Sequence, residues 1–196
     1  MDRLRDAWSW LVDEWQWPAG SLLVGVFLIA LAPAIAAACP LSFTLIYAQL
    51  PAYLLHQWEE HAGDRFRGYI NARLGGGFEL LTRPATFWIN SLGVWALDVA
   101  ALHAAVVVGP AAGLIAGYLS LLNGVIHVGQ AARFREYNPG LTTAVTLLIP
   151  LGGWCVYEAG RDAPIGYHVF GVAAIVGLHL LIVVHCVRRW RSRTQA

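Results

Sequence analysis

The sequence predicts an all-α membrane protein, a bundle of six transmembrane helices preceded by an interfacial amphipathic helix. Three observations predict this fold class. First, 58% of the 196 residues are hydrophobic and 13% are charged, whereas soluble domains are about 45–50% apolar and about 25% charged. Second, six apolar segments long enough to span a membrane follow one another along the chain. Third, arginines gather at alternate ends of these segments.

Residues 1–18 predict a helix that lies along the membrane surface. Its apolar side chains recur at helical spacing, namely Leu4, Trp8, Leu11 and Trp15. Charged side chains occupy the opposite face, a pattern typical of an amphipathic helix that tryptophan anchors among the headgroups. We expect Pro18 and Gly20 to end this helix. No signal peptide is apparent, because charges and tryptophans leave no short apolar core.

Residues 19–187 form the predicted six-helix transmembrane domain. Each apolar segment is near the roughly 20 residues that a helix needs to cross a bilayer. The segments cover about residues 21–38, 41–58, 86–108, 111–130, 141–157 and 165–187. Residues 59–85 form the one long connection, and we expect its Gly75–Gly77 run to be a flexible hinge. Residues 188–196 form a basic tail.

The arginine distribution predicts the orientation of the chain in the membrane. The sequence contains no lysine, and 12 of its 13 arginines face one side if both termini are cytoplasmic. Arg161 falls on the other side. Because cytoplasmic connections of membrane proteins are enriched in positive charge, we expect a multi-pass protein with both termini in the cytoplasm.

Composition argues against two other classes of function. The formal net charge is +1, and basic residues cluster only at the ends of the membrane segments, so we expect no nucleic-acid partner. The three cysteines, Cys39, Cys155 and Cys186, show no metal-binding spacing. Whether Cys39 and Cys155 pair as a disulfide is left open.

The most informative stretch is His56-Gln57-Trp58-Glu59-Glu60-His61, at the end of the second apolar segment. On a helix, His56, Glu59 and Glu60 share one face because they are three and four residues apart. An imidazole and two carboxylates can bind a metal ion or relay a proton. The alternative is that both glutamates lie in interfacial water, with His56 hydrogen-bonded to a neighbouring helix. We expect His61 to lie in the aqueous loop.

The predicted topology brings further polar residues to the same depth. Four helices each send a polar side chain to one level of the cytoplasmic leaflet, which holds His56, Asn90, His127 and His185. A deeper level, about one turn further along the helices, holds Asp98, Asn123 and His179. We expect His179 to face inward, and Asn123 to hold His127 in one tautomer. The alternative is a structural set of hydrogen bonds between membrane helices.

Three short motifs carry a resemblance to a known family. They are His56-x-x-Glu59-Glu60, Asn123-x-x-x-His127 and Tyr137-x-Pro139-Gly140-x-x-Thr143. In this order and spacing the chain resembles, over roughly residues 25–187, the bacterial membrane proteins named for their HXXEE motif. The resemblance implies a multi-helix protein of the bacterial cytoplasmic membrane and favours five residues as a site, namely His56, Glu59, Glu60, Asn123 and His127. It implies no particular reaction.

A looser likeness suggests a substrate class. Intramembrane glutamate proteases that process prenylated proteins carry Glu-Glu followed by Arg, with a histidine on each of two later helices. Here Glu59-Glu60 precedes Arg65, and His127 and His179 lie on later segments. The arginine spacing differs by one residue, and Asn123 stands where that family has phenylalanine. The histidine boxes of membrane hydroxylases and desaturases are absent from the sequence.

These observations give a leading hypothesis and two alternatives. The hypothesis is a membrane enzyme, a hydrolase before an oxidase, that acts on a lipid-soluble or prenylated substrate from the cytoplasmic leaflet. Glu59 or Glu60 would be the general base, and nitrogen and oxygen donors would hold zinc or iron. The expected ligands are His56, Glu60, His127 and His179, supported by Asn90, Asp98 and Asn123. The alternatives are a cation- or proton-coupled transporter and a structural membrane partner.

Overall fold

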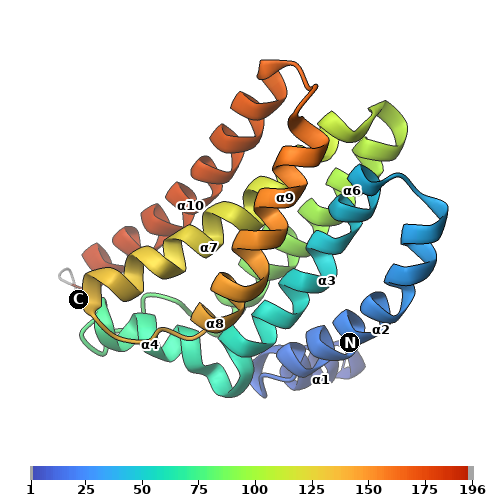
Figure 1. Ribbon diagram of the computed structural model, residues 1–196. Coiled ribbons are helices and arrows are strands. Elements are labelled where there is room, and N and C mark those ends of the chain that lie inside the picture. The colour runs from blue at the N-terminus through green and yellow to red at the C-terminus, as the bar shows by residue number, and fades with distance from the viewer. Residues whose placement is uncertain (1, 194–196) are drawn as a thin grey trace.

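The computed structural model describes residues 2–193, and in this part of the chain helices joined by short turns and loops are found, with no strand. Figure 1 shows the helices packed side by side, with α3 among its neighbours and α10 along one side. The long helices are α2 (Trp17–Ala38), α3 (Leu41–His61), α7 (Leu114–Phe134) and α10 (Ile165–Arg193). The all-α class predicted from composition is therefore confirmed.

Two further helical stretches are assembled from shorter pieces. One runs through α5 (Arg83–Asn90), η3 (Ser91–Ala96) and α6 (Leu97–Val108). The other runs through α8 (Leu141–Thr143), η5 (Ala144–Leu148) and α9 (Ile149–Gly160). Both η3 and η5 are π-helical turns, a local widening that often occurs near functional sites. The turn η4 (Pro110–Gly113) links α6 to α7.

Five helical stretches are long and apolar enough to cross a membrane, rather than the predicted six. They are Trp17–Ala38, Arg83–Val108, Pro110–Phe134, Leu141–Gly160 and Ile165–Arg193. The remaining predicted span, α3, has 21 residues but is less apolar. It contacts α2, α6, α7 and α9, and its buried residues include Gln49, His56 and Glu60. The helix can carry these polar groups because its neighbours, and not lipid, cover them.

The amino-terminal helix is shorter than predicted. Helix α1 (Asp2–Trp8) continues through η1 (Ser9–Asp13) and ends there, and Trp15 then adopts a φ of 64°. Pro18 does not end this helix but lies in the first turn of α2, where a missing N–H costs nothing. The apolar side chains of the predicted helix also differ in burial, since Leu4 is 80% exposed while Trp15 is buried. The continuous amphipathic helix over residues 1–18 is therefore not confirmed.

The long connection after α3 is folded. It contains η2 (Ala62–Asp64) and α4 (Arg65–Arg73), and Arg67 ties it together by contacts to Asp64 and to Glu79, the latter at 2.6 Å. The Asn71 side chain exchanges two 2.9 Å hydrogen bonds with the Leu81 backbone. Gly75 packs tightly against backbone oxygens. The connection thus closes the end of the bundle instead of acting as a free hinge.

The core of the described residues consists of three apolar clusters. Val12, Trp15, Trp17 and Phe87 form one of them, and the other two lie along the bundle. One contains Leu45, Ile46, Ala105, Leu114, Cys155 and Ala159. The other, nearer the end of α3, contains Tyr53, Val94, Leu119, Leu148 and Ile175. The cysteines do not form a disulfide, since Cys39 is exposed and Cys155 is buried, both as free thiols. The second cluster packs α3 against α7 next to the place where the polar residues of these two helices meet.

Candidate metal centre

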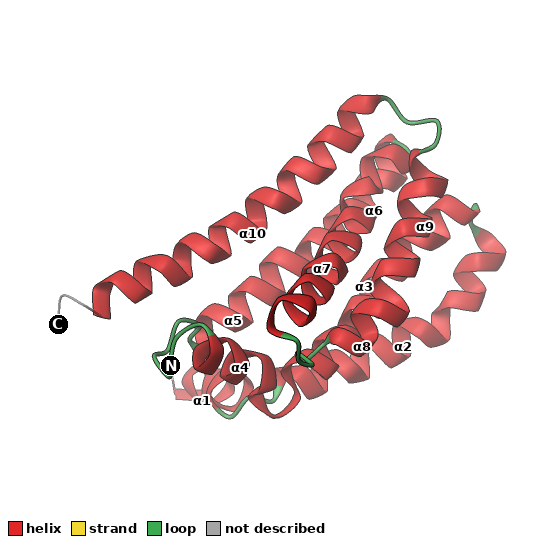
Figure 2. Cartoon of the chain, turned by 60° about the vertical axis from the view of Figure 1, so that its left-hand side comes forward, coloured by secondary structure: helices red, strands yellow, loops and turns green. Residues whose placement is uncertain are grey.

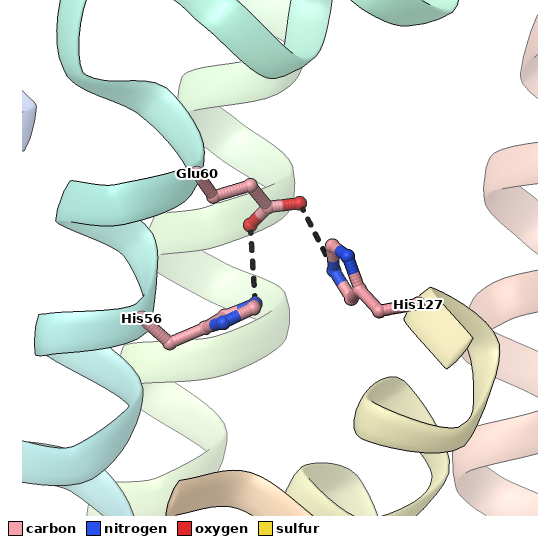
Figure 3. Close-up of side chains that lie close together, drawn as sticks. All are labelled: His56, Glu60 and His127. Atoms are coloured by element: carbon pink, nitrogen blue, oxygen red, sulfur yellow. Dashed lines mark ion pairs between the residues drawn. The ribbon is translucent and has the colours of Figure 1, made fainter. Parts of the chain in front are cut away.

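Three buried side chains converge where α3 and α7 approach each other. His56 and Glu60 lie one turn apart on α3, and His127 faces them from α7 (Figure 3). His56 Nε2 is 3.6 Å from Glu60 Oε2, and His127 Nε2 is 3.5 Å from Glu60 Oε1. The three residues are 0%, 6% and 2% exposed. The predicted convergence of these residues therefore holds in the structure.

The hydrogen bonds of His56 determine which of its nitrogens carries the proton. The hydroxyl of Thr143 contacts the Glu59 carboxylate, which can only accept, so this hydroxyl donates to Glu59. His56 Nδ1 lies 2.8 Å from the same hydroxyl oxygen and must donate to it. His56 Nε2 therefore carries a lone pair, to which the Asn123 amide donates at 3.1 Å.

His127 is held in the same tautomer by a different residue. The Asn138 amide Nδ2 donates to the His127 carbonyl oxygen at 2.8 Å, and this turns the amide oxygen Oδ1 toward the ring. His127 Nδ1 donates to that oxygen at 2.7 Å. In a neutral ring, His127 Nε2 then carries a lone pair aimed at Glu60 Oε1. The expected partner of His127, Asn123, bonds to His56 instead.

The facing atoms of this group require a cation between them. A nitrogen lone pair and a carboxylate oxygen are both acceptors, so a bare pair at 3.5 Å is repulsive unless a proton or a metal ion intervenes. Zinc bonds of about 2.0–2.2 Å in a tetrahedral site place neighbouring ligand atoms about 3.3–3.6 Å apart. One ligand atom from each of the three residues lies within 4.8 Å of the others. The group could therefore hold a metal ion.

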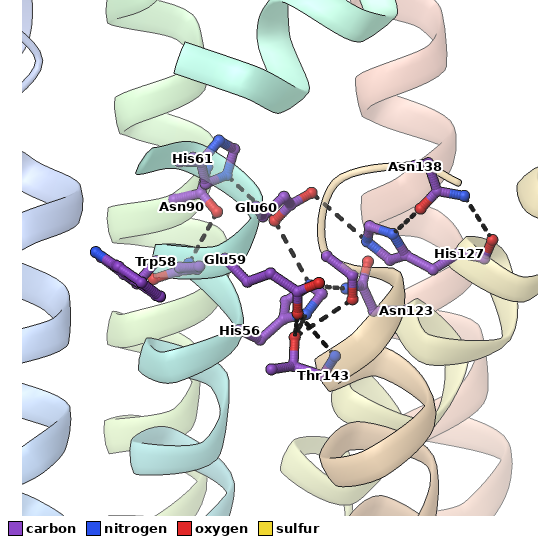
Figure 4. A network of polar contacts seen from close by, with 12 residues as sticks. His56, Trp58, Glu59, Glu60, His61, Asn90, Asn123, His127, Asn138 and Thr143 are labelled. Carbon is purple, nitrogen blue, oxygen red and sulfur yellow. Dashed lines mark hydrogen bonds and ion pairs between the residues drawn. The ribbon is translucent and has the colours of Figure 1, made fainter. Parts of the chain in front are cut away.

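Glu59 points to a different place from Glu60. Its carboxylate accepts a hydrogen bond from the Thr143 backbone N–H group at 2.7 Å (Figure 4). It also accepts from the Thr142 backbone N–H group at 3.1 Å and from the Tyr137 hydroxyl at 2.6 Å. Partial burial and the nearby Glu59 carboxylate raise the pKa of Tyr137. Glu59 therefore satisfies free N–H groups at the start of α8, as a capping carboxylate does.

Gly140 closes one wall of the centre. Its φ is +96°, and a Cβ added there would lie 2.8 Å from His56 Cε1 and 2.9 Å from His127 Cε1. The same Cβ would lie 3.4 Å from Glu60 Cβ. Glycine is needed here on two counts, because other residues rarely adopt this conformation and because a methyl group would collide with both imidazoles.

His61 is the residue whose environment differs most from the expectation. It is 1% exposed rather than aqueous, because its ring packs against Trp17, with ring centroids 4.8 Å apart. The indole of Trp15 donates to the His61 carbonyl oxygen at 2.7 Å. His61 Nε2 lies 3.2 Å from Glu60 Oε2, close enough for ionic contact but without hydrogen-bond geometry. Glu60 is thus surrounded by three imidazoles.

The remaining predicted residues lie around this centre in different ways. Asn90 accepts a 2.8 Å hydrogen bond from Gln57, whose amide oxygen in turn accepts one from the Trp95 indole. His179 bonds to the carbonyl oxygen of Ile175 in its own helix and is outside the group of three ligands. Asp98 is buried on α6 and is likewise outside this group. Depth in the membrane therefore predicted correctly that His127 joins His56 and Glu60, but it did not predict that His179 stays outside this group.

An apolar cavity of about 610 Å³ borders the centre. Glu60, His61 and His127 form part of its wall. The remaining lining is largely apolar and comes from α4, α5, α7 and α10. Val183 and Val187 line the cavity and are 55% and 43% exposed, so the cavity reaches the outer face of α10. Figure 2 shows this helix diverging from the rest of the bundle toward its carboxyl end.

Sequence reasoning missed Asn138 and Gly140 as parts of the centre, although both lie in the turn that carries the third motif. The feature of the sequence that could have identified them is their position directly before α8, the helix whose start faces Glu59.

Comparison with known proteins gives one match. A family model described as a protein of unknown function with an HXXEE motif matches residues 47–155, which contain His56, Glu60, His127 and Gly140. No curated protein matches the chain, and no solved structure does.

Proposed function

The chain belongs to the family of proteins with an HXXEE motif, whose function is unknown, and from this premise we propose that it is a membrane-embedded metalloenzyme. In this proposal His56, Glu60 and His127 hold one zinc or iron ion, and the enzyme hydrolyses a lipid-soluble substrate. The observation that carries the proposal is the convergence of three buried donors on the wall of an apolar cavity.

The donor set favours zinc or iron over calcium or magnesium. Two imidazole nitrogens and one carboxylate match the three protein ligands of many catalytic zinc sites, which keep a further position for water. Calcium and magnesium prefer shells made of oxygen. The hydrogen bonds to Thr143 and Asn138 leave both Nε2 atoms free of protons, as metal ligation requires. A metal bound to His56 Nε2 would take the place of the amide donor of Asn123.

The cavity supports a substrate that dissolves in lipid. A volume of about 610 Å³ falls within the range of sites for small organic ligands, about 300–1,000 Å³. Its lining is largely apolar, and Glu60 and His127 of the metal centre are among its polar groups. A long-chain ester or a prenylated molecule could thus enter beside Val183 and Val187, with its reactive carbon near Glu60.

Hydrolysis of an ester would proceed with the chain's own residues moving the protons. A metal held by His56, Glu60 and His127 would polarise a water molecule, and the Glu60 carboxylate would take a proton from that water. The water oxygen forms a bond to the ester carbonyl carbon, and the carbon–oxygen bond to the alcohol then breaks. The leaving oxygen would receive that proton from Glu60, which returns Glu60 to its carboxylate form. We assign base catalysis to Glu60 because Glu59 is engaged by Thr142, Thr143 and Tyr137.

We further propose that α3 crosses the membrane as a sixth span, in the bacterial cytoplasmic membrane. A sixth span returns the chain to the side on which it began, so both termini lie in the cytoplasm with 12 of 13 arginines. In this arrangement α1 and η1 lie at the cytoplasmic surface, and the metal centre lies in the cytoplasmic leaflet. Lipid is the surrounding partner of the exposed faces of α2 and α10.

Elemental analysis of the purified protein tests the proposal. Protein isolated in detergent without added chelator should carry zinc or iron in equimolar amount, and Glu60→Gln should lose it while still folding. Asp162→Asn, at an exposed acidic residue, is the matched control and should keep the metal. Lipid extracts from a deletion strain should accumulate an uncleaved apolar ester. Metal-free wild-type protein, or equal metal in Glu60→Gln, would refute the site.

A further inference from the structure

A second set of buried polar side chains lies outside the metal centre. Gln49 of α3, Asp98 of α6 and Ser120 of α7 are 0%, 2% and 0% exposed. We call these residues the polar layer. Gln49 and Asp98 lie on their helices between members of the two clusters along the bundle, and Ser120 directly follows Leu119 of one of these clusters. Asp98 lies near the middle of the 26-residue span Arg83–Val108. Ionisable residues at such depth are costly and are usually functional.

Four oxygens of the polar layer have no hydrogen-bond partner among the described residues. They are both carboxylate oxygens of Asp98, Oε1 of Gln49 and Oγ of Ser120. Buried polar atoms in folded proteins are nearly always paired, and each exception requires an explanation. The amide nitrogen of Gln49 is paired, since it donates to the Leu45 carbonyl oxygen at 2.8 Å. The amide oxygen is thereby turned away from that carbonyl and left for another partner.

Contacts with α9 place Gln49 and Ser120 at one level. Gln49 Nε2 lies 3.4 Å from the carbonyl oxygen of Leu151. A Cβ built on the next residue, Gly152, would lie 3.1 Å from the Ser120 Cβ. The two side chains therefore approach consecutive residues of α9 from α3 and α7.

Asp98 falls at the same level by its own neighbours. Along its helical stretch Asp98 lies between Val94, which packs in one cluster with Tyr53, and Ala105, which packs in the other with Cys155. Tyr53 is one turn beyond Gln49 on α3, and Cys155 is one turn beyond Leu151 on α9. Because these helices run in opposite directions, Tyr53 and Cys155 lie on either side of the level that Gln49 and Leu151 share. Asp98 thus faces the same part of the bundle interior from α6.

We propose that the polar layer binds one monovalent alkali cation, for which Na⁺ is the probe. Every available donor is an oxygen, as alkali cations prefer, and a single carboxylate balances a single positive charge. Within residues 2–193, Asp98 forms no ion pair with a basic side chain. A divalent ion would need more carboxylates and a larger oxygen shell. The site is independent of the metalloenzyme proposal.

The test is binding of radioactive ²²Na⁺ to the full chain in detergent, together with the melting temperature in NaCl against N-methylglucamine chloride at equal ionic strength. Wild type should bind Na⁺ saturably with one site per chain, and its melting temperature should rise with Na⁺ concentration, since a ligand that binds only the folded state stabilises it. Asp98→Asn should lose both responses. Ser120→Ala should bind about fivefold to tenfold more weakly, the effect of losing one polar contact. KCl, run in parallel, ranks the alkali cations.

Two controls keep the outcome decisive. Asp162→Asn, at the exposed acidic residue of the Gly160–Pro164 turn, and His127→Ala, in the metal centre, should both retain Na⁺ binding. If Asp98→Asn does not fold, Ser120→Ala and Gln49→Met carry the test. Absence of saturable Na⁺ binding would overturn the proposal. The proposal would also be overturned if the melting temperature rose at lower pH but did not change with Na⁺ or K⁺, because Asp98 would then simply be protonated.

Discussion

Replacing Gly140 with alanine tests the metal centre without removing any ligand. The new methyl group would lie 2.8 Å from His56 Cε1 and 2.9 Å from His127 Cε1. Because carbon atoms pack at about 3.5–4.0 Å, the rings would have to retreat by roughly 0.6–1.2 Å. Metal sites hold ligand distances to within about 0.2 Å. We expect metal affinity to fall by at least about 10–100-fold, the effect of disturbing a ligand's orientation.

The backbone conformation of Gly140 contributes separately to stability. An alanine at positive φ costs of order 1–3 kcal/mol, whether or not a metal is bound. Gly77 provides a matched control, since its φ is +90° and a Cβ there would meet nothing within 4 Å. Gly77→Ala should therefore show the same order of destabilisation with unchanged metal affinity.

The assay is competition with a chelator of known affinity, followed by metal analysis of the dialysed protein, with thermal melting of the same samples. Gly140→Ala should lose stability and metal affinity together, whereas Gly77→Ala should lose stability alone. Equal metal affinity in the two variants would show that the imidazoles of His56 and His127 do not converge on a metal beside Gly140.

Three further predictions concern the residues around the centre and the topology. Asn138→Ala should weaken metal binding by about 10–100-fold, because His127 loses the acceptor that fixes its tautomer; chelator competition measures this. Thr143→Val should lower the metal affinity by about tenfold, at the lower end of that range, because His56 loses a hydrogen-bond partner but keeps its position on α3. Thr146→Val is its control, since that hydroxyl bonds within its own helix. Cysteine at Arg161 should react with an impermeant reagent on intact cells, and cysteine at Arg73 should not; the reverse pattern would invert the proposed orientation.

Helical spacing and depth were sufficient to predict the three ligands. His56 and Glu60 share a face because they are four residues apart on one helix, and this holds in any environment. His127 was predicted as the third member because its helix ends at the same depth as the helix that carries His56 and Glu60. For His179 the reasoning held only in part, because the residue faces inward to the cavity but bonds to the Ile175 carbonyl oxygen and is outside the group of three. α10 packs chiefly on α7, and this leaves His179 in the cavity wall.

The errors in the sequence interpretation came from tertiary contacts that no local pattern reports. His61 follows two acidic residues and precedes a polar stretch, so it was expected in water. The structure buries it because Trp15 and Trp17 fold back over the end of α3. Asn123 was expected to orient His127 because both lie on one helix face. Asn138 has that role, since a turn can direct a side chain back toward the preceding helix.

The two adjacent glutamates of the motif explain each other once their directions are known. Glu60 points inward and offers an oxygen to both His56 and His127. Glu59 points to the start of α8 and accepts a hydrogen bond from the Thr143 hydroxyl. The oxygen of this hydroxyl in turn accepts a hydrogen bond from His56 Nδ1. Removing Glu59 would therefore free the Thr143 hydroxyl to donate, and His56 could then turn its lone pair away from the metal. In the proposed site one glutamate would bind the metal ion, and its neighbour would keep the imidazole in the form that can bind it.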